Sequence, residues 1–382
     1  MTLKQKAGGT EKPTRPASPW KKLYQNLEAM QVQRYRDLME EGNHREIIFN
    51  LRETPTGVSA LARLMQDADI QTMKTVIEIF RSASENKVDI LHAVPALAKC
   101  LAMPDISWDA ESALSSAAIK GTNISASIPA LTILLSDQNP NMRIEITSLL
   151  GHAAKSGADI TIAFEALVKG LSDTESIQLG TLTTFRVAAE RGMDISVAIP
   201  ALAKSLSDGS NPWETLNVLD NAAKYGINIG AAVTALANAF ADPDPNFRLK
   251  AAQILEMANA NGTDIDMAFP ALFQAMMTND GALRTKAFEI LEKRAVLGDH
   301  NCRIALSSAL LGLTGSKTFA NEANQNSVIF TETIGALQRI VGKVREAEEK
   351  GKKKPDEYDE YAEEWRKEEE RVKRDEEYED YT

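Results

Sequence analysis

The sequence has few of the residues that build catalytic or metal centres. Its 382 residues include two cysteines and four histidines, and aromatic residues make up 6%. Because Cys100 and Cys302 stand far apart in the chain, we expect no disulfide framework and a reducing compartment. Neither Cys-x-x-Cys nor His-Glu-x-x-His occurs, which removes the usual zinc sites. We therefore expect no cofactor, no metal and no enzymatic activity.

Long apolar runs are also missing. No stretch approaches the roughly 20 residues that cross a bilayer, and no apolar segment of the signal-peptide type opens the chain. The sequence therefore predicts a cytoplasmic protein without a membrane partner.

Positive charge is scarce in the body of the chain. Of the net charge of −11, residues 23–342 carry −10, because residues 1–22 contribute +5 and residues 343–382 contribute −6. An acidic body repels a phosphate backbone, so nucleic acid is not an expected partner of residues 23–342.

What the sequence does contain is a repeat. The dipeptide Ala-Leu recurs eight times at intervals of 34 to 36 residues, at Ala60, Ala96, Ala130, Ala166, Ala201, Ala235, Ala271 and Ala305. A unit of this length cannot bury its apolar face alone, so successive units must stack. The period predicts a solenoid.

Each unit contains the start and stop signals of two helices. The first helix, helix A, is predicted to begin at an N-cap residue after an Asp/Asn-Ile pair. These predicted N-caps are Ser125, Thr161, Ser196, Gly230 and Asp266. In four units a proline directly precedes Ala-Leu, which predicts a kink or a tight first turn in helix A.

The second helix, helix B, opens in several units with Asn-Pro or Asp-Pro, an N-cap followed by a first-turn proline. It is predicted to end at a glycine in the left-handed conformation. These glycines are Gly121, Gly157, Gly192, Gly226, Gly262 and Gly298.

Helix B has a predicted core face, counted back from that glycine. Position −7 is always apolar and position −4 is alanine in five units, so both rows lie on one side of the helix. The −7 row contains Phe80, Leu114, Leu150, Phe185, Leu219, Leu255 and Leu291.

This pattern resembles the HEAT repeat, in particular the HEAT-like repeats grouped with phycobilin lyases, over about residues 55–312. The resemblance rests on Pro-Ala-Leu in helix A, an Asp between the helices, an early Arg in helix B and an Ala-Ala-x-x-Gly ending. It implies an all-α fold, a right-handed α-solenoid of about eight helical hairpins. It also implies an Asp–Arg ladder between units, so we interpret Asp137, Asp173, Asp208 and Arg143 as structural.

The ends of the chain differ from the array. We expect a disordered basic arm over residues 1–22, an N-terminal helical cap over 23–54 and the repeat array over 55–312. Residues 313–350 are predicted to form a linker and a C-terminal capping helix, and residues 351–382 an acidic, tyrosine-containing tail.

Three features that resemble chemical sites have a structural interpretation. The segment 312–318 has the wrong glycine spacing for a phosphate loop, so it is interpreted as a linker. Cys100 is interpreted as a buried structural thiol. Trp108 and Trp213 are aligned with Met142, Phe247 and Leu283, and this column is interpreted as packing between units.

The remaining surface is the side of helix B opposite the core, at positions −9 and −5, which the resemblance places on a concave surface. Its centre is polar and nearly uncharged, which favours a partner that can be bound without a heavy desolvation cost. The candidate partner-binding residues are Ser112, Ser116, Ser148, His152, Asn217, Asn221 and Gln253.

The predicted function is a non-enzymatic scaffold that holds a protein or peptide in this groove. Two alternatives stay open: a HEAT-like lyase or chromophore-handling protein with unidentified catalytic groups, and a rigid spacer that presents the acidic tail. The sequence predicts no oligomeric state.

Overall fold

The structure is a computed structural model that describes residues 19–54, 56–66, 68–297, 299, 301–304, 306, 333–347 and 349. These residues form α-helices and short 3₁₀ helices, and the described part contains no strand. The chain divides into two compact units, Met1–Ala198 and Ile199–Thr382. The sequence signals place no boundary there, and each unit is described by itself.

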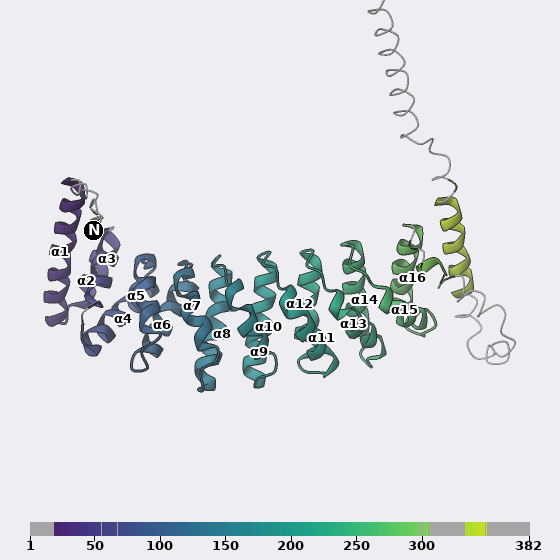
Figure 1. The fold of residues 1–382 in the computed structure, drawn as a ribbon, viewed down its shortest axis with the longest axis horizontal. Coiled ribbons are helices and arrows are strands. Elements are labelled where there is room, and N and C mark those ends of the chain that lie inside the picture. Colours follow the sequence, from purple (N-terminus) through teal and green to yellow (C-terminus); the bar gives the residue numbers. More distant parts are fainter. Residues whose placement is uncertain are drawn as a thin grey trace, which may run out of the picture. The chain divides into compact units, whose positions relative to one another are not determined.

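The first unit opens with α1 (Pro19–Glu40) and α2 (His44–Glu53) and continues as hairpins of a helix A and a helix B (Figure 1). The hairpins are α3 (Gly57–Leu64) with α4 (Ile70–Glu85), α5 (Val94–Cys100) with α6 (Ser107–Ile119), α7 (Ile128–Leu134) with α8 (Pro140–Lys155), and α9 (Phe164–Gly170) with α10 (Glu175–Glu190). The 3₁₀ helices η1 (Leu91–Ala93), η2 (Ser125–Ser127), η3 (Thr161–Ala163) and η4 (Ser196–Ala198) precede the A helices.

The second unit continues the pattern. Its hairpins are α11 (Ile199–Ser207) with α12 (Pro212–Lys224), α13 (Val233–Asn238) with α14 (Pro245–Ala260), and α15 (Phe269–Met276) with α16 (Gly281–Val296). Its 3₁₀ helices are η5 (Gly230–Ala232), η6 (Ala239–Ala241) and η7 (Asp266–Ala268). Residues 333–347 form a further helix, which buries Leu337 and Ile340, and its Thr333 Oγ1 donates to the Met276 carbonyl at 3.1 Å.

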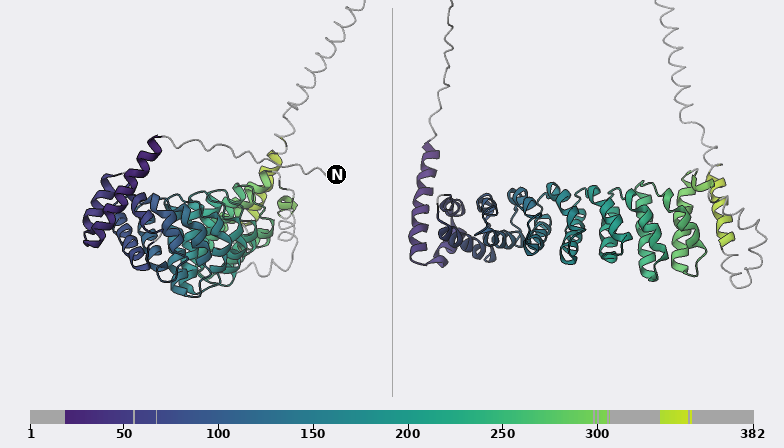
Figure 2. Two further views of the ribbon diagram at one scale, coloured as in Figure 1. Left: turned by 60° about the vertical axis from the view of Figure 1, so that its left-hand side comes forward. Right: turned by 60° about the horizontal axis from the view of Figure 1, so that its bottom comes forward.

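Within each unit, B helices stack on B helices and A helices on A helices, in the order of the sequence (Figure 2). Helix α8, for example, packs between α6 and α10, and α14 packs between α12 and α16. The predicted all-α solenoid is confirmed, with seven complete hairpins in the described residues. The unit predicted around Ala305, its glycine Gly298, and the two ends of the chain fall largely outside those residues.

The predicted start of helix A is wrong in its detail. Residues such as Ser125 begin a 3₁₀ turn, and the side chain that accepts the backbone N–H is the Asp or Asn two positions earlier. The Asn123 Oδ1 accepts from the Ser125 N–H at 2.9 Å, and equivalent contacts begin η1, η3, η4, η5 and η7. The expected tight first turn is this 3₁₀ turn, which precedes the A helices α5, α7, α9, α11, α13 and α15 but not α3.

The predicted starts of helix B are confirmed where Asn139 and Asp244 accept from the N–H two residues on, at 3.0 and 2.9 Å. The predicted ends are confirmed too, because five of the six glycines have φ between 76° and 94° and Gly298 is not described. In the hairpin that lacks this glycine, Lys87 takes the position with φ 64°. A side chain there carries the steric cost of the left-handed region.

The core row is confirmed at every position. Each side chain of the −7 row is fully buried, and the −4 alanines from Ala117 to Ala258 are at most 1% exposed. This row is shared by both units, and it fixes the rotation of each B helix about its axis. The opposite side of helix B is therefore the exposed one.

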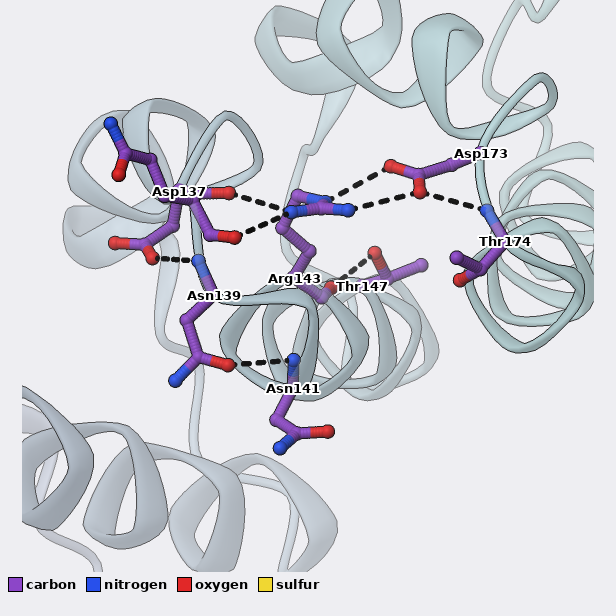
Figure 3. Close-up of polar contacts among 8 residues, drawn as sticks. Asp137, Asn139, Asn141, Arg143, Thr147, Asp173 and Thr174 are labelled. Atoms are coloured by element: carbon purple, nitrogen blue, oxygen red, sulfur yellow. Dashed lines mark hydrogen bonds and ion pairs between the residues drawn. The ribbon is translucent and has the colours of Figure 1, made fainter.

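Arg143 connects neighbouring hairpins of the first unit (Figure 3). Its guanidinium donates to both carboxylate oxygens of Asp173 at 2.9 and 3.0 Å, and to the carbonyl of Asp137 at 2.8 Å. Arg248 repeats this in the second unit with Asp280 and the Asp242 carbonyl. The predicted Asp–Arg ladder is thus present as these two separate ion pairs, one in each unit. The structural role predicted for Asp208 is wrong, because Asp208 is exposed and forms no ion pair with a described residue.

Candidate binding face on helix B

In the first unit the exposed side of helices α6, α8 and α10 presents three rows of side chains. Positions −13, −9 and −5 lie four residues apart, so they form a continuous stripe along each helix. The stripe is Trp108, Ser112 and Ser116 on α6; Ile144, Ser148 and His152 on α8; and Leu179, Thr183 and Val187 on α10. We call these nine residues the first helix-B face.

The second unit has an equivalent set, the second helix-B face. It consists of Trp213, Asn217 and Asn221 on α12; Leu249, Gln253 and Met257 on α14; and Thr285, Glu289 and Lys293 on α16.

The candidate residues predicted from the sequence lie on these two faces. Ser148, Asn217 and Gln253 are exposed, whereas Ser112, Ser116, His152 and Asn221 are half-buried. The three serines and His152 lie on the neighbouring helices α6 and α8. The asparagines and Gln253 lie on the neighbouring helices α12 and α14. Their assigned role in partner binding stays a prediction.

The apolar row at position −13 was missed, because Trp108 and Trp213 were aligned with the wrong column. Met142, Phe247 and Leu283 stand two positions earlier, at −15, and are at most 5% exposed. Trp108 is 41% and Trp213 39% exposed, so packing between neighbouring hairpins does not bury either ring. Counting back from the glycine would have placed both tryptophans in the row of Ile144, Leu179 and Leu249.

Trp213 still makes one contact between hairpins. Its ring meets Phe247 edge-on, with centroids 5.2 Å apart and an interplanar angle of 84°. That geometry is favourable for aromatic pairs, and it holds the Trp213 ring while leaving part of it exposed.

Beside the second face, neighbouring B helices are joined by ion pairs at fixed positions. The acid at −6 of one helix meets the lysine at −12 of the next: Asp220 with Lys250 at 2.7 Å, and Glu256 with Lys286 at 2.9 Å. Hydrogen bonds from Lys293 and Lys286 hold the pKa of Glu256 below its usual value despite its partial burial.

In the first unit the same positions of α8 and α10 hold Gly151 and Gly180. A Cβ at Gly180 would stand 3.2 Å from Thr147 Cγ2, and one at Gly151 would stand 3.1 Å from Thr184 Oγ1. The Thr184 hydroxyl lies 3.0 Å from the Thr147 carbonyl of the facing helix, within hydrogen-bond reach. The two glycines therefore permit a close helix approach without charged groups.

Between α6 and α8 the arrangement differs again. The −6 position is Ser115, the −12 position of the next helix is Glu145, and Glu111 stands at −10, where other helices have Ile77, Leu182 or Leu216. Glu111 is 4% exposed, and its Oε1 has no hydrogen-bond partner among the described residues. Burial, and to a lesser extent the Glu145 charge, raises the pKa of Glu111 to about 7.

Two hollows lie in the first unit, and one of them reaches α6. One of about 510 Å³ lies beside α2, α4 and α6 and is lined on its α6 side by Asp109 and Ser112. The other, of about 770 Å³, lies on the helix-A side, where Met65, Met73 and Cys100 contribute to its lining. Only the first continues the helix-B face.

The two thiols and His152 are not arranged as catalytic nucleophiles. Burial raises the pKa of the Cys100 thiol, and raises that of Cys302 to about 12, so both stay protonated at neutral pH. Burial and Lys155 lower the pKa of His152, and its Nδ1 is buried without a hydrogen-bond partner among the described residues. The described face thus presents hydrophobic and hydrogen-bonding groups with no activated nucleophile.

Comparisons with known proteins give little beyond this geometry. No protein-family model matches the chain, and no curated protein matches it either. Among solved structures, a crystallised engineered protein is 23% identical, covering 54% of this chain and 98% of its own, with a TM-score of 0.38. A microtubule polymerase with an array of tumor overexpressed gene (TOG) domains, described in tubulin recruitment and assembly, is 10% identical. It covers 79% of this chain and 90% of its own, with a TM-score of 0.28. Neither similarity is high enough to support a statement about family or function.

No described helix is both long and apolar enough to span a membrane.

Proposed function

We propose that this protein is a HEAT-like scaffold whose helix-B faces bind a segment of a partner protein. The observation that carries the proposal is the exposed apolar row at −13, above all Trp108 at 41% exposure beside the half-buried Ile144 and Leu179. Large apolar side chains that recur on neighbouring helices form a contiguous patch, and such patches mark interaction sites. Tryptophan is also among the residues that contribute most to binding at protein interfaces.

The two polar rows complete the proposed site. Ser112, Ser148 and Thr183 in the first unit, and Asn217 and Gln253 in the second, provide donors and acceptors for a partner backbone. Because these side chains are uncharged, burying them against a partner that hydrogen-bonds to them costs less desolvation than burying charged groups. An apolar row next to hydrogen-bonding rows is the surface that an extended or helical segment requires.

The lyase alternative has less support. It requires a reactive thiol or imidazole in a pocket. Cys100 and His92 do line the helix-A hollow, but burial raises the pKa of both thiols, and His152 lines neither of the two hollows described above. Two free, buried cysteines also suit a reducing compartment, so we propose a cytoplasmic location. Imaging of the tagged full chain tests that location, and an extracellular signal would contradict it.

Affinity capture by the full chain, quantified by mass spectrometry, tests the binding proposal. The first-face variant carries Trp108→Ala and Leu179→Ser, and the second-face variant carries Asn217→Lys, Asn221→Glu and Gln253→Lys. A partner that binds a helix-B face should be lost by about tenfold or more in one of them.

The matched control is Ile133→Ser with Ile162→Ser, which removes apolar surface that is 76% exposed on α7 and 62% exposed on η3. This control should retain the partner, and circular dichroism should show native helicity for all three variants. If both face variants retain every partner, the faces are only solvated surfaces. Loss in a chain ending at residue 350 would then favour the acidic tail.

A further inference from the structure

In the α6–α8 helix pair, Glu145 stands at −12, where α14 and α16 have a lysine, and a second carboxylate, Glu111, stands at −10 of α6. In α12–α14 and α14–α16, the acid at −6 has a lysine partner on the next helix. In α6–α8, Glu145 is exposed and Glu111 is buried behind it, and neither forms an ion pair with any described Lys or Arg. An unpaired buried carboxylate is costly, so this site lacks a cation that its equivalents have.

The missing cation would lie on the first helix-B face. Glu145 directly follows Ile144 in sequence and stands three positions before Ser148 on α8, so its carboxylate borders the apolar and polar rows. On α6, the exposed ring of Trp108 is followed by Asp109, which lines a hollow together with Arg81 of α4, so Glu145 is the exposed carboxylate left for a cation of the partner. An aromatic face together with carboxylates is a favourable site for a lysine ammonium or an arginine guanidinium.

We propose that the first helix-B face binds a basic segment of a partner protein, with a Lys or Arg side chain at Glu145 and Trp108. An apolar side chain of the same segment packs on Ile144 and Leu179. This inference rests on the proposed function and adds the chemistry of the partner to it. The second face differs between its helices, because Asp220 and Glu256 are already neutralised by lysines of the chain itself, although Glu214 follows Trp213 there as Asp109 follows Trp108.

Selection of peptides against the full-length protein tests the inference. Random peptides of about twelve residues, displayed on phage, are selected on the native chain and sorted by whether Trp108→Ala abolishes their binding. Peptides that depend on Trp108 should contain Lys and Arg several times more often than the starting library.

The second measurement is the dissociation constant of the best such peptide. Glu145→Gln should weaken its binding about threefold to tenfold, and Glu145→Lys by more than tenfold. Glu165→Gln is the matched control, because it removes the same charge from the exposed side of α9 in the same unit. It should leave binding unchanged, which separates a local contact from general attraction to an acidic chain.

The possible failures are distinguishable. Trp108-dependent peptides without an excess of Lys or Arg would overturn the inference and leave the proposed function in place. If no selected peptide depends on Trp108, Leu179 or the second face, both proposals are wrong.

The basic residues of the chain's own N-terminal segment are a competing occupant. A full-length variant with Lys4, Lys6, Lys12 and Arg15 replaced by Gln tests it. If peptides bind the first face only in that variant, the occupant is this segment and the proposal of a partner protein is overturned.

Discussion

The helix pairs α6–α8 and α14–α16 have opposite electrostatic arrangements between their helices. In α14–α16, Glu256 accepts hydrogen bonds from Lys286 and Lys293, and its charge is neutralised within the chain. In α6–α8, the Glu145 charge acts on Glu111, and neither carboxylate forms an ion pair with a lysine of the described residues. The core positions beneath, Leu114 and Leu255, are equally buried. The apolar row alone therefore suffices to stack the hairpins, which leaves the polar positions between them free to serve binding.

The largest expected effect tests the shared part of this comparison. Leu150→Asp in the first unit and Leu219→Asp in the second each place an unpaired carboxylate at a fully buried position. Both should lower the free energy of unfolding by about 4 kcal/mol. Urea denaturation followed by circular dichroism measures it, and Ser148→Asp at an exposed position should change it by less than about 0.5 kcal/mol. Unaltered unfolding of either core variant would contradict the inward orientation of the −7 row.

The electrostatic difference predicts opposite pH dependences for two Glu→Gln variants. Glu111 has a raised pKa in the folded state, so the folded protein binds more protons and loses stability as pH rises from about 4.5 to about 7. Glu111→Gln should therefore stabilise the protein at pH 8, by at most about 3 kcal/mol, with little effect near pH 4.

Glu256 has a lowered pKa, so its contribution is present above the unfolded value and is lost as pH falls through the folded value. Glu256→Gln should then destabilise the protein at pH 7 by about 1 kcal/mol, with a smaller effect in acid. Thermal unfolding of both variants from pH 4 to pH 8 makes the comparison. Parallel pH profiles for the two variants would contradict it.

The smallest effect concerns the hairpin without a glycine at the end of helix B. Lys87→Gly should stabilise the protein by about 0.5 to 1 kcal/mol, because φ at Lys87 is 64° and glycine adopts it without steric cost. Lys74→Gly, in the interior of the same helix α4, is the control and should destabilise by about 1 kcal/mol. Denaturant titrations measure both changes in the free energy of unfolding. If both substitutions changed it in the same direction, a steric cost at Lys87 would be refuted.

Much of the fold could be predicted because it depends on repeat positions with one simple requirement, such as an apolar side chain or a glycine. The −7 row is apolar in every hairpin, and five described glycines have the expected backbone. The start of helix A was misplaced because Asn123 and Ser125 are both good capping residues, and only geometry shows which one accepts the hydrogen bond.

The candidate site was predicted in part. The polar rows follow from helical periodicity, whereas the exposed tryptophans were lost through a two-residue alignment shift. Glu111 did carry a signal, as an acid in a row that holds Ile77, Leu182 and Leu216 in other hairpins. The sequence could not show that Glu111 lacks a hydrogen-bond or ion-pair partner, because which residue of the next helix faces it depends on the offset between the two helices.

The close approach of α8 and α10 at Gly151 and Gly180 limits how this repeat array can be rearranged. If α14 replaced α8 by recombination between repeats, Glu256 would stand where Gly151 leaves room for Thr184, and the two helices could not approach as closely. If α16 replaced α10, Lys286 would displace Gly180 and meet Thr147 in place of an acid. Hairpins of this chain are thus matched to their neighbours by the residues at −6 and −12. Duplication or shuffling of single repeats would require compensating changes on both sides of the new junction.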